Sequence, residues 1–280
     1  MFNPLVLNPA YAGSKEVISS VLLYRNQWVN FDGAPTTLTA SINSPLKNKK
    51  MGLGFHLISD KIGPTTLTEY VGSYAYRIRV GRGKLSFGLR ASIYDFRCDW
   101  TKVDFKDKSD VSSFQQQTKS TNTAFDAGVY YYNTSFYAGL AFSHLTSGLK
   151  KTVKQSNTFD GAFVPHLTAT IGKAFEATPM ITFRPSAVLR YTKNAPVSAD
   201  INISFLLDQK VWIGLGMRSN SDLIFSMEYN LSRNMRMGYS YDSSTRDFQT
   251  TNKGTHEFFL GFDIDYFKSK TVSPRIFKYN

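Results

Sequence analysis

The chain has 280 residues, of which 42% are apolar and 15% aromatic, and it carries a formal net charge of +12. Charged residues make up only 19% of it, below the roughly 25% that is usual for soluble domains. Its one cysteine, Cys98, excludes an intrachain disulfide framework and a cysteine metal cluster. No apolar run approaches the roughly 20 residues that a transmembrane helix needs. The start, MFNPLVLNPAYAG, has neither a basic nor a long apolar stretch, so it is not an intact signal peptide, and either the protein never leaves the cytoplasm or the chain is a processed one.

Apolar and polar residues alternate with a period of two along almost the whole chain, which is typical of β-strands. In chain order the alternation predicts about 14 strands, near residues 16–30, 36–44, 50–60, 65–80, 83–98, 122–133, 134–145, 163–175, 180–193, 196–208, 209–219, 221–231, 233–243 and 254–267. The connections between strands alternate too: short turns such as PLKNK and YNTS alternate along the chain with more variable connections, which include the long segments 99–121 and 146–162. This arrangement predicts an up-and-down meander of antiparallel hairpins.

The two faces of these predicted strands differ in chemistry. Along residues 223–231 the apolar set Leu223, Phe225, Met227, Tyr229 and Leu231 alternates with Ile224, Ser226, Glu228 and Asn230. Many strands exceed the usual 5–6 residues, roughly, of globular sheets and reach the roughly 9–11 that cross a membrane. We therefore predict an all-β transmembrane barrel with apolar faces toward lipid and a polar lumen. The alternative is a soluble β-sandwich, or two small barrels, with the apolar faces inward.

We interpret the chain as one domain, because no shift in composition marks a boundary. Residues 1–15 form a turn-rich N-terminal segment, 16–267 the barrel and 268–280 a basic tail. The short turns and the tail are expected on the periplasmic side and the longer loops outside, as is usual for such barrels. The N-terminal segment either enters the lumen as a partial plug or meets a periplasmic partner at the short-turn mouth.

Catalytic and metal-binding patterns are weak. The histidines His56, His144, His166 and His256 lack ligand-like spacing. Asp263 and Asp265 share a strand face, where pairing with lumen arginines is favoured over cation binding. We predict no enzyme activity, no metal site and no cofactor. The basic excess near the short turns suits anionic lipid or an acidic partner, and no nucleic-acid-binding motif accompanies it.

Two N-terminal stretches, FNPLVLNPAYAGS (2–14) and YRNQWVNFDGAPTT (24–37), resemble the signature of the PorP/SprF family. These are outer-membrane proteins of Bacteroidetes linked to type IX secretion and gliding. GYSYD (238–242), GTHEFFLGFDIDYF (254–267) and SPRIF (273–277) also resemble family features. The motif positions are Asn8, Pro9, Tyr11, Gly13, Tyr24, Arg25, Gln27, Trp28, Gly33 and Pro35. In the predicted first strand, Tyr24, Asn26 and Trp28 share one face, and Arg25 and Gln27 the other.

The resemblance implies a non-enzymatic outer-membrane barrel that anchors a secreted adhesin, or other cargo with a type B C-terminal domain. It also implies periplasmic or peptidoglycan-linked partners such as PorE, PorK and PorN. The two long loops carry aromatic residues suited to binding a partner, Trp100, Phe105, Phe114 and Phe159. The main alternative is a transporter or channel for a small hydrophobic solute, which would need a continuous apolar pocket. An outer-membrane hydrolase would need a Ser–His constellation on one inward face.

Overall fold

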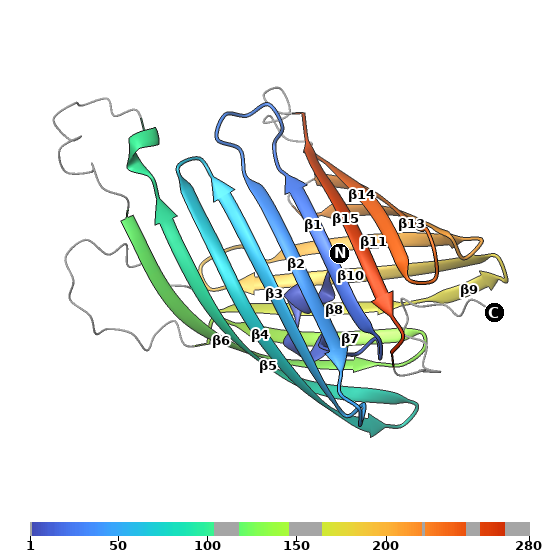
Figure 1. Cartoon of the computed structure of the whole chain (residues 1–280). Coiled ribbons are helices and arrows are strands. Elements are labelled where there is room, and N and C mark those ends of the chain that lie inside the picture. The colour runs from blue at the N-terminus through green and yellow to red at the C-terminus, as the bar shows by residue number, and fades with distance from the viewer. Residues whose placement is uncertain (1, 104–117, 146–163, 220–221, 245–252, 267–280) are drawn as a thin grey trace.

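The computed structural model describes residues 2–103, 118–145, 164–219, 222–244 and 253–266, and its described part is almost entirely β-sheet (Figure 1). The strands are β1 (Ile18–Asn26), β2 (Thr36–Pro45), β3 (Met51–Ile62), β4 (Thr65–Val80), β5 (Gly83–Cys98), β6 (Thr118–Tyr132), β7 (Phe136–Ser143), β8 (His166–Lys173), β9 (Phe175–Thr178), β10 (Ile181–Thr192), β11 (Ser198–Leu207), β12 (Val211–Arg218), β13 (Asp222–Asn230), β14 (Met235–Ser244) and β15 (Thr255–Ile264).

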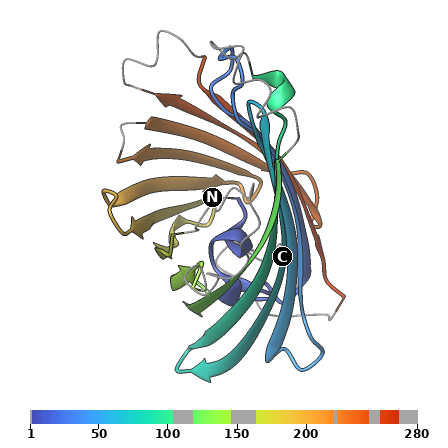
Figure 2. The same ribbon diagram turned by 90° about the vertical axis from the view of Figure 1, so that its left-hand side faces the viewer.

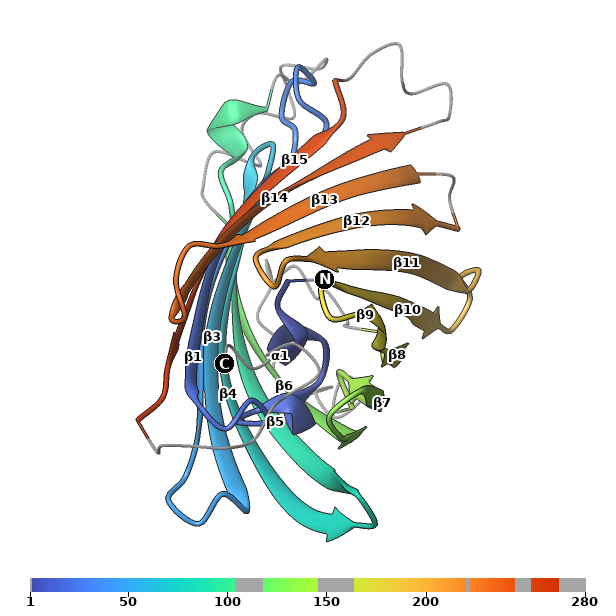
Figure 3. The same ribbon diagram turned by 90° about the vertical axis from the view of Figure 1, so that its right-hand side faces the viewer.

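These strands close into a ring. Each barrel strand pairs antiparallel with its neighbours in sequence, and β1 pairs with both β2 and β15. The short strand β9 is an extra: it pairs only with β10, whereas β8 and β11 are the barrel neighbours of β10. The ring therefore contains 14 strands, which confirms the predicted barrel, and Figures 2 and 3 show the strands curving around a central space. The predicted strand at 163–175 is interrupted at Ala174, between β8 and β9.

The alternation of the sequence becomes the two faces of the wall. In β13, Leu223 and Phe225 are 53% and 42% exposed, whereas Ser226 is buried. In β5, Leu89 is 64% exposed and its neighbour Arg90 only 6%. The exposed apolar side chains all around the ring form the outer belt that hydrocarbon favours, and the polar side chains face inward. Closure also gives every strand of the ring a partner on each side, as a lipid environment requires. Along β6 the pairing with β7 covers Ala127–Tyr132.

Some strand boundaries differ from the sequence prediction. The first strand ends at Asn26 and not at residue 30, because Trp28 and Asn30 adopt positive φ angles of 50° and 74° and turn the chain. The third hairpin closes at the long-loop end through Gly63 and Pro64 alone, since β3 runs on to Ile62. The sheet is uneven, with 16 residues in β4 and β5 but only eight in β12.

The N-terminal segment lies inside the ring (Figure 3). It contains a single helical turn, α1 (Pro4–Leu7), and a 3-10 turn, η1 (Pro9–Tyr11). A second 3-10 turn, η2 (Trp100–Lys102), follows β5 at the long-loop end. None of the helices in the described residues is long and apolar enough to cross a membrane.

Candidate functional site: a plugged lumen

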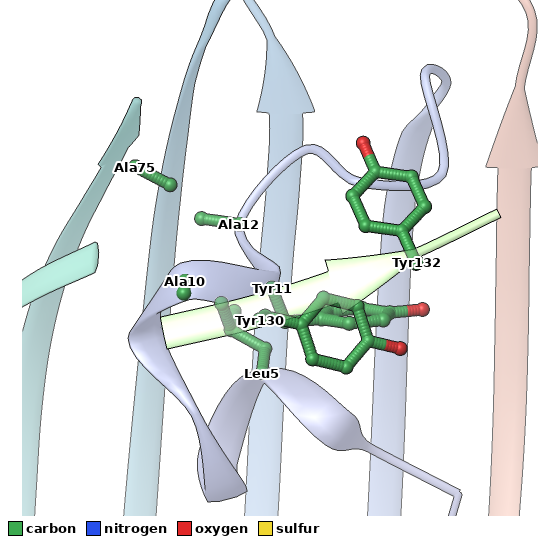
Figure 4. Close-up of a cluster of buried hydrophobic side chains, with 7 residues drawn as sticks. All are labelled: Leu5, Ala10, Tyr11, Ala12, Ala75, Tyr130 and Tyr132. Carbon is green, nitrogen blue, oxygen red and sulfur yellow. The ribbon is translucent and has the colours of Figure 1, made fainter. Parts of the chain in front are cut away.

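Residues 2–16, here called the plug, pack on the inner wall formed by the long strands. Their apolar anchor joins Leu5, Ala10, Tyr11 and Ala12 to wall residues Ala75, Tyr130 and Tyr132 (Figure 4). Tyr11 meets Tyr130 edge-on, with ring centroids 5.6 Å apart. At the start of the plug, Phe2 stacks on Phe259 of β15 at 4.1 Å. Burial of these aromatic rings gives the plug an apolar attachment to both sides of the lumen.

Asn8 fixes the middle of the plug to the wall. Its side-chain oxygen accepts a hydrogen bond from the Ala10 amide (2.9 Å), which caps η1. Its amide nitrogen donates to the carbonyls of Val129 and Leu140 (3.0 and 3.2 Å), on β6 and β7. Gly128 makes room for it, because a Cβ there would lie less than 3.0 Å from the Asn8 oxygen. All polar atoms of this buried side chain are thereby satisfied.

Two arginines of the wall bind the backbone carbonyls of the plug. Arg90 donates to the carbonyls of Leu5 (2.5 Å) and Val6 (3.0 Å) near the end of α1, and it pairs with Asp126 (3.2 Å). Arg77 donates to the carbonyl of Ala12. These are charge-assisted hydrogen bonds, which are about twice as strong as neutral ones. The wall thus supplies donors for the carbonyls that a short helical turn leaves without partners.

Ion pairs hold the plug at its junction with β1. Lys15 is 3% exposed and pairs with Asp263 of β15 at 3.0 Å. Glu16 pairs with Lys84 and, at 3.6 Å, with Lys49. Asp263 also lies 3.6 Å from Arg236, so the expected pairing of Asp263 with lumen cations is present. Asp265 lies beyond the end of β15 and is exposed, so the two carboxylates do not share a lumen site.

A cavity of about 250 Å³ remains between the plug and the opposite wall. Its apolar side includes Phe2, Pro4, Leu7, Tyr11, Tyr130 and Tyr137. Its polar side includes Thr170, Ser186, Asn202, Ser226 and Ser240, and charged residues follow toward the long loops. A space of about 20 Å³ beside Phe2, Arg184 and Trp212 lies between it and the short turns, and another of about 50 Å³ lies at the short-turn mouth. The plug therefore leaves a chamber toward the long loops and smaller spaces toward the short turns.

A chain of ion pairs, here called the collar, crosses the part of the chamber wall that is nearest the long loops. It runs from Arg190 to Asp200 (2.9 Å), Asp200 to Arg218 (3.4 Å), Arg218 to Asp242 (3.8 Å), Asp242 to Arg25 (2.8 Å) and Arg25 to Glu257 (3.1 Å). These residues come from β10, β11, β12, β14, β1 and β15. Because each arginine already faces carboxylates, the collar has little attraction left for a further anion.

The second family motif forms the first hairpin. Tyr24 is 45% exposed on the outer face, and Arg25 faces inward to the collar, as the alternation predicts. The prediction that Trp28 shares a strand face with Tyr24 is wrong, because Trp28 lies beyond the end of β1 and its amide donates to the Thr255 hydroxyl (3.3 Å).

The remaining positions of that motif shape the loop after β1. The backbone amide of Gln27 donates a hydrogen bond to the carbonyl of Pro35 (2.9 Å). The carbonyl of Gly33, whose φ is 71°, accepts from the Gly63 amide (2.9 Å). In the first motif, Gly13 has a φ of 69°, and its backbone amide donates to the side-chain oxygen of Asn43 (3.0 Å). Pro9 of the same motif is buried at the start of η1. The motif positions thus build the plug, the collar and the first hairpin.

Of the four aromatic residues predicted to bind a partner, the structure describes one. Trp100 begins η2 at the long-loop end, and its indole nitrogen donates to the Thr118 hydroxyl (2.8 Å). Phe105, Phe114 and Phe159 lie outside the described residues, so their partner-binding role stays a prediction.

The histidines lie in different settings. His56 is buried in β3, and His144 contacts the Tyr94 hydroxyl (2.9 Å) with its ring 5.4 Å from that of His166. His256 contacts the Tyr239 hydroxyl (2.7 Å). Within the described residues, no three His, Cys, Asp or Glu side chains gather as a metal site would require.

Sequence reasoning missed several residues that make this site, among them Arg77, Arg90, Lys15 and Asn202. Their inward positions follow from the alternation, but their partners do not. The signal available was the combination of inward arginines with inward glycines, such as Gly52 and Gly88, which open room on a wall. That combination indicates that something approaches the wall closely.

The comparison with family models decides the relationship of this chain, because one model matches residues 1–262: "Type IX secretion system membrane protein PorP/SprF". The chain belongs to the PorP/SprF family. This confirms the resemblance seen in its motifs. A search of curated proteins finds no match.

Solved structures share the fold of this family member at low sequence identity. The CymD monoaromatic hydrocarbon channel is 11% identical, with a TM-score of 0.57 over 94% of this chain and 93% of that one. The TodX deltaS2S3 mutant monoaromatic hydrocarbon channel is 9% identical, with a TM-score of 0.53 and 95% of each chain covered. The outer membrane protein Omp33 of Acinetobacter baumannii is 8% identical, with a TM-score of 0.52 over 89% of this chain and 100% of that one. These likenesses concern the fold alone.

Proposed function

We propose that this PorP/SprF protein is a non-enzymatic outer-membrane component of type IX secretion that binds and anchors a secreted surface protein. The partner is an adhesin or other cargo with a type B C-terminal domain, held by the long-loop end. The short turns face the periplasm, where the basic rim meets periplasmic components of the PorE, PorK or PorN kind. Outer-membrane lipid surrounds the apolar belt. Gliding motility is the cellular process that we assign to the anchored adhesin.

The observation that carries this proposal is the plug. Its contacts occupy the lumen from Phe2 to Glu16, and the cavities toward the short turns, of about 20 and 50 Å³, are far smaller than the chamber. A barrel closed in this way suits holding a partner at its rim better than passing a solute. Family membership supports the same role, because the family is described by its place in type IX secretion.

A second candidate is a channel for a small hydrophobic solute. Two of the similar folds are monoaromatic hydrocarbon channels. Against it stands the charged collar on the upper wall of the chamber, since an apolar solute there would cover buried ionic groups without offering them hydrogen bonds. The apolar chamber wall, including Phe2 and Tyr11, is what favours it.

The test is affinity purification of the full chain from detergent-extracted native membranes, followed by mass spectrometry. We expect recovery of a secreted protein that carries a type B C-terminal domain. Recovery of the barrel alone with a bound apolar solute would refute anchoring and support the channel.

A variant series tests the long loops. We expect the Phe105→Ser, Phe114→Ser double variant and the Phe159→Ser variant to lose the partner, because apolar anchors carry most of the binding energy at interfaces. Phe31→Ser is the matched control, since Phe31 is an exposed aromatic residue in the short loop after β1. Equal recovery of the partner by all variants would contradict the assignment of these loops.

A further inference from the structure

The chamber between the plug and the β10–β14 wall has the features of a ligand site that the anchoring role does not use. Its two sides differ: aromatic and aliphatic groups of the plug and of β6 and β7 face small hydroxyl and amide side chains of β8 to β14, together with Val188, Ile224 and the charged collar. Volumes of this order, slightly below the roughly 300 Å³ at which drug-sized sites begin, suit a small ligand.

Asn202 supplies the strongest sign that a ligand belongs there. It lines the chamber from β11, it is only 6% exposed, and within the described residues its side-chain oxygen has no hydrogen-bond donor. Its oxygen is packed against Gly216 of the wall, where a Cβ would come within 3.0 Å of it. Buried polar groups nearly always have a partner, so an amide side chain that lines a cavity and makes no hydrogen bond indicates a missing partner.

The aromatic side is equally well placed. Tyr130 and Tyr137 have ring centroids 6.1 Å apart, and Tyr11 meets Tyr130 edge-on. Tyr137 lies close to Gly172 of the wall, where a Cβ would come within 3.0 Å of its ring. Tyrosine rings offer an apolar face together with a polar edge.

The chemistry of the lining selects among ligand classes. A hydrocarbon would leave Asn202 and the collar without hydrogen bonds. A strongly anionic ligand would compete with carboxylates that already pair with Arg25, Arg190 and Arg218. An extended peptide would need a strand edge to bind its backbone, but the wall strands around the chamber are paired on both sides. A neutral polyol fits, because each hydroxyl both donates and accepts hydrogen bonds.

We propose that the chamber binds a saccharide unit, whose C–H face lies on the tyrosines and whose hydroxyls bond to Asn202, Ser226 and Ser240. The inference goes beyond the anchoring function and does not depend on it. Such a unit comes either from a surface polysaccharide or from a glycan on a secreted protein, because both present the same polyol chemistry.

The experiment is isothermal titration calorimetry of the full chain in a zwitterionic detergent, since glucoside and maltoside detergents carry sugar headgroups that would compete. The probes are a panel of neutral mono- and disaccharides. Three further probes are titrated separately: polysaccharide released from lipopolysaccharide, glycans released from secreted proteins, and synthetic peptides from the type B C-terminal domain. We expect saturable saccharide binding with a stoichiometry of about one, as a single chamber requires.

Matched variants locate the binding. Asn202→Leu removes the amide that makes no hydrogen bond to the described residues, and Tyr137→Leu removes the aromatic face. Each should weaken saccharide binding by at least about tenfold. Asn122→Leu and Tyr131→Leu are the controls: Asn122 bonds to Ser120 on the opposite wall, and Tyr131 lines the outer surface. Resistance of the Lys15 site to trypsin verifies that each variant keeps its plug.

Each result decides the question. Absence of binding by every saccharide, equal binding by the Asn202→Leu and control variants, or displacement of the saccharide by the peptide would overturn the proposal. Loss of saccharide binding in Asn202→Leu with unchanged recovery of the secreted partner would separate this site from the anchoring surface.

Discussion

Replacement of Gly88 by alanine is expected to release the plug from the lumen wall. Gly88 lies in β5 directly beneath η1, and a Cβ there would lie less than 3.0 Å from backbone atoms of Pro9 and Ala10. Ordinary contact begins at 3.4 Å, so the plug backbone has to move by at least about 0.4 Å, the difference between these two distances. Because backbone atoms and not the end of a flexible side chain are in the way, this shift moves the whole turn.

The magnitude follows from the contacts that the shift disturbs. Overpacking costs about 1–3 kcal/mol. The hydrogen bond from the Ser86 hydroxyl to the Ala10 carbonyl (2.7 Å) contributes about 1 kcal/mol more. A weakening of plug attachment by about 2–4 kcal/mol raises the population of the released plug about 30- to 1,000-fold.

Trypsin cleavage after Lys15 measures that population. Lys15 is buried and paired with Asp263 in the native protein, so cleavage requires release of the plug. When release and rebinding are fast, the cleavage rate follows the open population. We expect the N-terminal peptide ending at Lys15 to appear about 30- to 1,000-fold faster in Gly88→Ala, as the weakening of attachment requires. Planar-bilayer recordings on the same sample should show new conductance.

Gly72→Ala is the matched control. Gly72 lies in the neighbouring strand β4, and a Cβ there meets nothing within 4 Å. Alanine in a strand is favoured over glycine by about 0.5–1 kcal/mol, so this variant should be slightly more stable and equally resistant at Lys15. The reasoning would be refuted if Gly88→Ala resisted trypsin as well as Gly72→Ala, or if both were cleaved equally fast.

Three further predictions concern the collar, the outer belt and the plug. Arg25→Met should lower the free energy of unfolding by about 2–3 kcal/mol in a urea titration, because it leaves Glu257 without its cation and Asp242 with only the more distant Arg218 (3.8 Å). Arg97→Met, at an exposed pair, should change it by less than about 1 kcal/mol. Leu89→Arg on the outer face should lower the free energy of unfolding from lipid vesicles by about 2–4 kcal/mol, whereas Val80→Arg at the end of β4 should lower it by about 0–1 kcal/mol. Equal losses would contradict the position of the belt. Asn8→Ala removes the two hydrogen bonds that this side chain donates to the wall. A loss of about 1–3 kcal/mol in plug attachment should speed trypsin cleavage after Lys15 about 5- to 150-fold. Unchanged resistance would show that these bonds do not hold the plug.

The inward or outward direction of a side chain could be predicted from the sequence where alternation is regular. In β13 the exposed positions are the ones that the pattern assigns to lipid, and Arg25 faces the lumen as expected. Prediction failed where the backbone leaves the extended conformation. Trp28 has a positive φ of 50°, so the alternation ends before it, and β8 is interrupted at Ala174.

The sequence by itself determined the fold class and the two faces of the barrel wall, because a period of two is a local property of an extended chain in contact with two solvents. Only the tertiary structure decided where the N-terminal segment lies and what remains open beside it. Its contacts join residues far apart in the chain, such as Leu5 with Arg90, Asn8 with Leu140 and Lys15 with Asp263. No local pattern encodes such pairings, because they exist only once closure of the ring brings the two walls around the same lumen.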